Sequence, residues 1–267
     1  MYLNSTVDDD DVDDPAYHSV GEAALEKRVF ESMTLARIRE YLPQQTDPNT
    51  VDTYFGNPTG LIQFVGKKST DASVARQTEF GSAPFQIGTD GLVGCTIVTV
   101  VSKRAVYMGH YWEEESWSSN YYFPRRVLNF IAGRQPQQGI GPAFNPALFN
   151  RPDDDTRVYI MHPRRGIRVY TSAIYRGKLT QLRTLFNQNL LPGVPIATWM
   201  YIPVNPRRGQ PDPIADQPWR RHAIFQYDPN AHGAGNRGWR LFYEDHYFDD
   251  TNPPPGPASA NGIPDLP

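Results

Sequence analysis

Residues 92–112 read Leu-Val-Gly-Cys-Thr-Ile-Val-Thr-Val-Val-Ser-Lys-Arg-Ala-Val-Tyr-Met-Gly-His-Tyr-Trp. Two apolar runs, Thr96 to Val101 and Ala105 to Trp112, lie on either side of the polar break Ser102-Lys103-Arg104. Runs of this length that are rich in β-branched and aromatic residues are typical of strands, and a short polar break between them is typical of a hairpin turn. The stretch therefore predicts an antiparallel hairpin in a β-rich core.

The hairpin carries the single cysteine of the chain, Cys95, at its entry and a histidine, His110, near its exit. If the chain folds back at Ser102-Lys103, Cys95 and His110 lie directly opposite each other, with Cβ atoms about 4.5–5.5 Å apart. An imidazole at that distance can take the proton of a thiol and make it a nucleophile. A register shifted by one residue would send the two side chains to opposite faces of the sheet. The pair predicts a catalytic site.

Cys95 also has a simpler interpretation. Free cysteine is among the most buried residue types and often packs like a small apolar side chain. The alternative is a non-catalytic secreted binding or structural protein in which Cys95 is buried and inert. The two interpretations differ in the reactivity of the thiol and in its distance from His110.

Thr89 lies six residues before Cys95, in the segment Gly88-Thr89-Asp90-Gly91-Leu92-Val93-Gly94-Cys95. A threonine, a Gly-Cys turn and a hairpin that returns a histidine resemble the cysteine–histidine glutamine deamidases. These include the catalytic domain of cytotoxic necrotizing factor toxins, the lethal-factor-type deamidase toxins and the chemoreceptor glutamine deamidases. The resemblance covers residues 89–110 and departs from the pattern at Val93, where those toxins usually have serine.

This resemblance implies a toxin-like effector hydrolase that acts on a glutamine side chain in a protein or peptide. Cys95 would attack, His110 would be the base and Thr89 would have a supporting role. Two other stretches, residues 101–107 and 240–244, look like secreted fungal proteins of unassigned function. The resemblance makes the chain a candidate secreted fungal deamidase.

The same chemistry can be written from the residues alone. Main-chain N–H groups around Gly94 and Cys95 are candidate donors to the oxyanion, because a glycine turn exposes them. Water would complete deamidation and an amine would complete transglutamination, and the sequence favours neither. The group that orients His110 also stays open between a backbone carbonyl and a side chain. Glu113 would point away from His110 if the strand continued that far.

Other partners and cofactors are not indicated. The six histidines are scattered, with no HExxH motif and no cysteine pair, so we expect no metal and no cofactor. A net charge of −3 gives no overall attraction to nucleic acid. No apolar run approaches the roughly 20 residues that span a membrane. The sequence does not indicate an oligomeric state.

Composition divides the chain into three parts. Residues 1–28 contain the acidic block Asp8 to Asp14, which we expect to be disordered, and end in Lys27-Arg28, either a propeptide cleavage site or the basic end of a helix. Residues 29–250 are the predicted catalytic domain, and residues 251–267 are a proline-rich tail. Met1 to Thr6 does not look like a signal peptide, so secretion is inferred from the Lys-Arg pair, the Asn4-Ser5-Thr6 sequon and the proline content.

The predicted fold class is α+β, with a central mixed sheet or β-sandwich, flanking helices and long loops. Besides the hairpin, strands are predicted at residues 61–65, 157–161, 195–204, 223–227 and 239–243. Helices are predicted at residues 30–41, where Pro43 would stop the helix, and at residues 125–132 and 178–191.

Overall fold

The computed structural model describes residues 30, 32–47, 55, 72–164, 173–203 and 217–251. The acidic segment 1–28, the predicted strand 61–65 and nearly all of the predicted tail lie outside the described residues.

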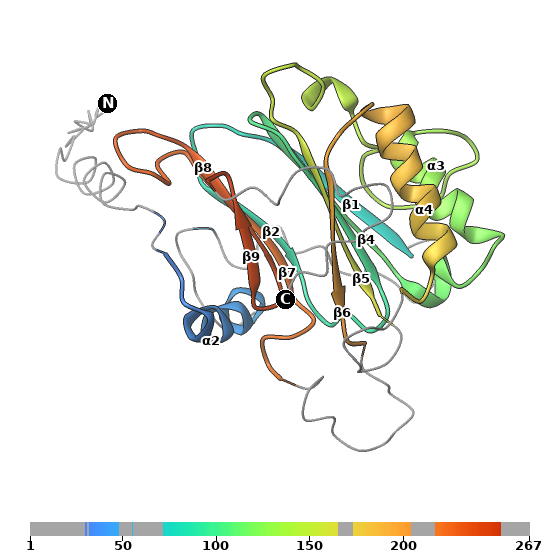
Figure 1. The fold of residues 1–267 in the computed structure, drawn as a ribbon, viewed down its shortest axis with the longest axis horizontal. Coiled ribbons are helices and arrows are strands. Elements are labelled where there is room, and N and C mark those ends of the chain that lie inside the picture. Colours follow the sequence, from blue (N-terminus) through green and yellow to red (C-terminus); the bar gives the residue numbers. More distant parts are fainter. Residues whose placement is uncertain are drawn as a thin grey trace, which may run out of the picture.

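Two sheets form the body of the molecule (Figure 1). The five-stranded sheet has the order β1-β4-β3-β5-β6, and only its β5–β6 pair is parallel, which makes it mixed. The four-stranded sheet has the order β2-β7-β8-β9 and is antiparallel. The strands of the first are β1 (Ser73–Glu79), β4 (Ala105–Tyr111), β3 (Thr96–Val101), β5 (Arg157–Pro163) and β6 (Ile196–Tyr201); those of the second are β2 (Phe85–Thr89), β7 (Ala223–Asp228), β8 (Gly238–Tyr243) and β9 (His246–Asp249).

Helices cover the outer faces of both sheets, which confirms the α+β class (Figure 1). On the five-stranded sheet lie α3 and α4, and on the four-stranded sheet lies α2, whose Ile38 and Leu42 pack against Ile224 and Phe242. The helical elements are α2 (Leu35–Thr46), η2 (Glu113–Trp117), η3 (Pro124–Leu128), α3 (Asn129–Ala132), η4 (Pro146–Leu148), α4 (Arg176–Thr184) and η5 (Leu185–Leu190).

Strand β3 is buried on both faces, which explains why four of its six residues are Ile or Val. Ile97 and Val101 point into the core between the two sheets, whereas Val98 and Val100 point into the core under the helices. Each such side chain contributes roughly 1.5–3 kcal/mol when fully buried. A strand in the middle of a layered fold therefore carries apolar residues on both faces, and this is the pattern from which the hairpin was predicted.

Helix α2 differs from its prediction at both ends. It begins at Leu35, where the Thr34 hydroxyl accepts a hydrogen bond from the Arg37 N–H at 3.3 Å, and it ends at Thr46. Pro43 lies inside the helix and does not stop it. The Asp47 N–H binds the Pro43 carbonyl at 3.1 Å, so the last turn is completed beyond the proline.

The hairpin turn lies one residue further along than predicted, at Lys103-Arg104. Ser102 pairs with Ala105 through a main-chain bond of 2.9 Å, and the Ser102 hydroxyl accepts from the N–H groups of Arg104 and Ala105, both at 3.0 Å. The predicted pairing of Cys95 with His110 is therefore wrong: Ile97 lies opposite His110. The register is displaced by two residues, which leaves every side chain on its expected face.

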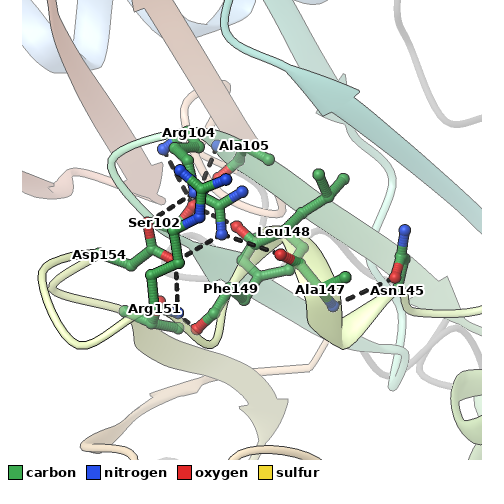
Figure 2. A network of polar contacts seen from close by, with 10 residues as sticks. Ser102, Arg104, Ala105, Asn145, Ala147, Leu148, Phe149, Arg151 and Asp154 are labelled. Atoms are coloured by element: carbon green, nitrogen blue, oxygen red, sulfur yellow. Dashed lines mark hydrogen bonds and ion pairs between the residues drawn. The ribbon is translucent and has the colours of Figure 1, made fainter.

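Contacts from a distant loop hold this turn in place (Figure 2). Arg104 donates to both carboxylate oxygens of Asp154 at 2.7 Å, and the Ser102 hydroxyl donates to the Leu148 carbonyl at 2.9 Å. Asp154 also accepts from the Arg151 N–H at 2.9 Å. The neighbouring guanidinium accordingly lowers the pKa of Asp154. The loop from residue 145 to residue 154 thus fixes where the hairpin bends.

Replacing Asp154 with asparagine is expected to lower the free energy of unfolding by about 2 kcal/mol, because the Arg104 guanidinium loses its bidentate carboxylate partner. Chemical denaturation measures the change. The matched control is Asp155→Asn, since Asp155 pairs with Arg157 at 3.0 Å but its side chain is 58% exposed. Equal losses in the two variants would contradict a special role for the turn network.

Candidate functional site

Thr89 and His110 meet across the two sheets. Thr89 is the last residue of β2 in the four-stranded sheet, and His110 is the penultimate residue of β4 in the five-stranded sheet. The Thr89 hydroxyl and His110 Nδ1 are 2.8 Å apart, and both side chains are buried. The sequence did not decide whether a backbone carbonyl or a side chain orients His110. In the structure the contacting group is a side-chain hydroxyl, that of Thr89.

Cys95 lies on the same face of the hairpin as His110. It precedes β3 and belongs to the same buried cluster between the sheets as Ile97 and Met108. Because His110 lies opposite Ile97, Cys95 is its diagonal neighbour rather than its direct partner. Diagonal positions are about 7–8 Å apart at Cα and less at the side chains. Thr89, Cys95 and His110 therefore gather at the end of the hairpin away from the Lys103-Arg104 turn.

Trp112 fixes the plane of the His110 ring. The two rings are stacked, with centroids 3.6 Å apart and planes inclined by 9°. Stacking on one side and a hydroxyl at Nδ1 leave the imidazole little rotational freedom. Trp112, the second residue after His110, thus has a packing role here.

The Cys95 thiol is in a dry environment, with 4% of the residue exposed. Burial raises the pKa of Cys95 to about 11, and the charges of Glu113 and Glu115 act in the same direction. The main-chain N–H groups of Val93 and Glu113 act in the opposite direction. The thiol is therefore protonated at neutral pH in this state.

Glu113 does not continue the strand. Strand β4 ends at Tyr111, and Glu113 begins the short π-helical turn η2. Its carboxylate lies against Gly94: a Cβ atom built on Gly94 would be 1.7 Å from Glu113 Oε2. Gly94 also has φ of +90°, a conformation that side chains other than glycine rarely adopt. The backbone conformation therefore favours glycine at this turn, and a side chain there would also displace the Glu113 carboxylate.

Two tyrosines complete the surroundings of the Gly94-Cys95 turn. The Tyr175 hydroxyl donates to Glu113 Oε1 at 2.9 Å, and the Tyr201 hydroxyl donates to the Cys95 carbonyl at 2.8 Å. The Gly94 N–H was predicted to bind the oxyanion. In the structure it hydrogen-bonds to the Tyr201 hydroxyl, an interaction that lowers the pKa of Tyr201. Tyr175 and Tyr201 come from segments without a recognisable motif, so no sequence signal indicated them. Glu113 had one weak signal, its place directly after the predicted strand.

Other features lie elsewhere. A cavity of about 240 Å³ opens at the opposite end of the hairpin and is lined by Lys103, Arg157 and Trp239 among others. In the described part of the chain, no three His, Cys, Asp or Glu side chains are grouped so as to hold a metal ion. Within the same residues, no helix has the length and apolar character needed to cross a membrane.

Comparisons with protein-family models, with curated proteins and with solved structures found no match to this chain.

Proposed function

We propose that this protein is a cysteine hydrolase that releases ammonia from the side-chain amide of glutamine in a protein or peptide. The observation that carries the proposal is the 2.8 Å contact between Thr89 and His110, which brings together residues of two different sheets beside Cys95. We assign the ring proton of His110 to Nδ1, which would donate to the Thr89 hydroxyl, and give Nε2 the role of the base.

The reaction then has two halves. His110 Nε2 takes the thiol proton while the sulfur bonds to the amide carbon, and the carbonyl electrons move to the oxygen. When that intermediate collapses, the C–N bond breaks and the nitrogen leaves as ammonia with the proton from His110. Water, deprotonated by His110, attacks the thioester, and the C–S bond breaks to restore the thiol. An amine in place of water would give transglutamination.

A raised thiol pKa fits a particular version of this mechanism. A thiol that is neutral at rest transfers its proton only as the sulfur attacks, so His110 acts as a general base and not as one half of a resting ion pair. The main-chain N–H groups of Val93 and Glu113 act on the sulfur and favour its developing negative charge, which leaves the Cys95 N–H as the proposed donor to the oxyanion.

A second candidate function is supported by the burial of Cys95. A thiol that is 4% exposed, with a pKa of about 11, is also what a non-catalytic binding or structural protein would have. In that case the Thr89–His110 contact would only join the two sheets, as the Tyr243 hydroxyl does when it donates to Thr99 at 2.8 Å.

The experiment is an incubation with an unfolded, glutamine-rich protein, in which released ammonia is measured and conversion of glutamine to glutamate is located by mass spectrometry. A labelled primary amine in a parallel sample detects transglutamination. We expect the wild-type protein to be active and Cys95→Ser to be inactive. Equal activity of the two proteins, or no conversion by either, would support the second candidate function instead.

A further inference from the structure

The carboxylate of Glu113 is held in contact with the nucleophile turn by a residue from another part of the chain. Tyr175, the residue before α4, fixes Oε1 through its hydroxyl at 2.9 Å, while Oε2 lies against Gly94. Glu113 is half-buried, so its carboxylate is only partly solvated. This geometry places a tethered negative charge beside the residue that precedes Cys95.

Among the residues that the structure describes, the other charged groups that act on Cys95 do not neutralise that charge. Glu115, on the same short helix, adds to it, and Tyr175 and Tyr201 are hydroxyl groups whose pKa values are raised by burial. Lys178 lies 5.5 Å from the Tyr175 ring, but its ammonium donates to the Trp117 carbonyl. Burial raises the pKa of Glu113, and the Tyr175 hydrogen bond opposes that rise.

We propose that Glu113 is a positioning residue for Cys95, whose Tyr175-held carboxylate adds to the effect of burial in keeping the thiol neutral and protonated until His110 accepts the proton. The neutral thiol is far less reactive than a thiolate toward oxidants and stray electrophiles, so this charge protects the nucleophile between turnovers. The inference rests on the proposed function in calling Cys95 the nucleophile. Its test needs no substrate.

The chain is well suited to the test because Cys95 is its only cysteine. With ¹³C-labelled cysteine, the Cβ of Cys95 gives a single resonance whose chemical shift follows ionisation of the thiol, and alkylation by iodoacetamide gives an independent rate. Glu113→Gln keeps the shape of the side chain and an oxygen for Tyr175, but removes the charge. We expect it to lower the thiol pKa, with about tenfold more thiolate at a given pH for each unit lost.

The matched control is Glu114→Gln, which removes the same charge one residue away from an exposed side chain. We expect it to leave the thiol titration unchanged. Tyr175→Phe releases the carboxylate from Gly94 and is expected to lower the thiol pKa as well, while adding it to Glu113→Gln produces no further change. This non-additivity would show that the two residues act through one contact.

Three results would overturn the inference: an unchanged titration in Glu113→Gln, an equal shift in Glu114→Gln, or faster alkylation without any shift in the thiol pKa. The last would mean that Glu113 merely covers the sulfur. If Glu113→Gln fails to fold, Tyr175→Phe provides the test by itself. A shifted titration in a protein that hydrolyses no glutamine would retain this inference and reject the proposed function, whereas deamidation with an unshifted titration would do the reverse.

Discussion

Replacing His110 with alanine is expected to lower the rate of ammonia release by about 10²–10⁴-fold, the usual contribution of a general acid–base group. The loss should appear in kcat, because His110 is proposed to move protons rather than to bind the substrate. Steady-state kinetics on a glutamine-containing peptide measures it, and thermal unfolding shows whether the variant is folded.

The chain offers a closely matched control for this substitution. His246 is also stacked on a tryptophan, Trp199, with ring centroids 4.5 Å apart and planes inclined by 7°. His246→Ala therefore removes a similar stacking arrangement three strands away from Thr89 in the four-stranded sheet, and we expect kcat to stay within about twofold of wild type. A similar loss in both variants would mean that ring packing, and not proton transfer, accounts for the effect of His110.

Thr89 tests the orientation of the same ring. Thr89→Val keeps the shape but removes the hydroxyl, and a lost orienting hydrogen bond worth about 1.4–2.8 kcal/mol corresponds to about 10-fold to 100-fold in kcat. Thr89→Ser retains the hydroxyl and is expected to recover most of the activity. A serine variant as impaired as the valine variant would show that the methyl group of Thr89 matters and the hydrogen bond does not.

The hairpin could be predicted from sequence because its strands are buried on both faces, but its register could not. The bend at Ser102-Lys103 was an assumed register, because Ser-Lys is not a preferred two-residue hairpin turn. The observed bend depends on Asp154 and Leu148, which lie 50 and 46 residues from their hydrogen-bonding partners. Such contacts leave no periodic signal. The observed register differs from the predicted one by two residues, an even number, so Cys95 and His110 still lie on the same face. They are diagonal neighbours, however, and not the directly opposed pair that was predicted.

The missed strands share a physical cause. In β1 the residues from Arg76 to Glu79 are partly or fully exposed at the sheet edge, and β9 has four residues. Neither has the apolar run that marked β3. The strand β2, which carries Thr89, is a five-residue edge strand, so the meeting of Thr89 with His110 depends on how the two sheets stack. Motif spacing suggested these two residues, but their contact is a property of the three-dimensional fold.

Acidification from pH 7 to pH 4.5 is expected to destabilise the protein by about 2–3 kcal/mol through His162 alone. This residue is 1% exposed and lies on the face of β5 that packs under the helices, and its Nε2 has no hydrogen-bond partner among the described residues. Burial lowers the pKa of His162 from 6.5 to about 4, with help from the nearby charge of Arg183.

The sign of this effect follows from proton binding. In the unfolded chain His162 takes up a proton near pH 6.5, but in the folded chain it does so only near pH 4, so the unfolded state binds more protons between these values. The stability is fully present above about pH 6.5 and is lost as the pH falls toward 4. The loss in free energy of unfolding is measured by urea denaturation at pH 7 and pH 4.5, in wild type and in His162→Phe. The phenylalanine ring is uncharged and keeps most of the volume of the histidine side chain. We expect the phenylalanine variant to lose about 2–3 kcal/mol less than wild type, and the half-buried His246→Phe to show a smaller difference. Equal losses in wild type and His162→Phe would show that His162 does not drive acid unfolding.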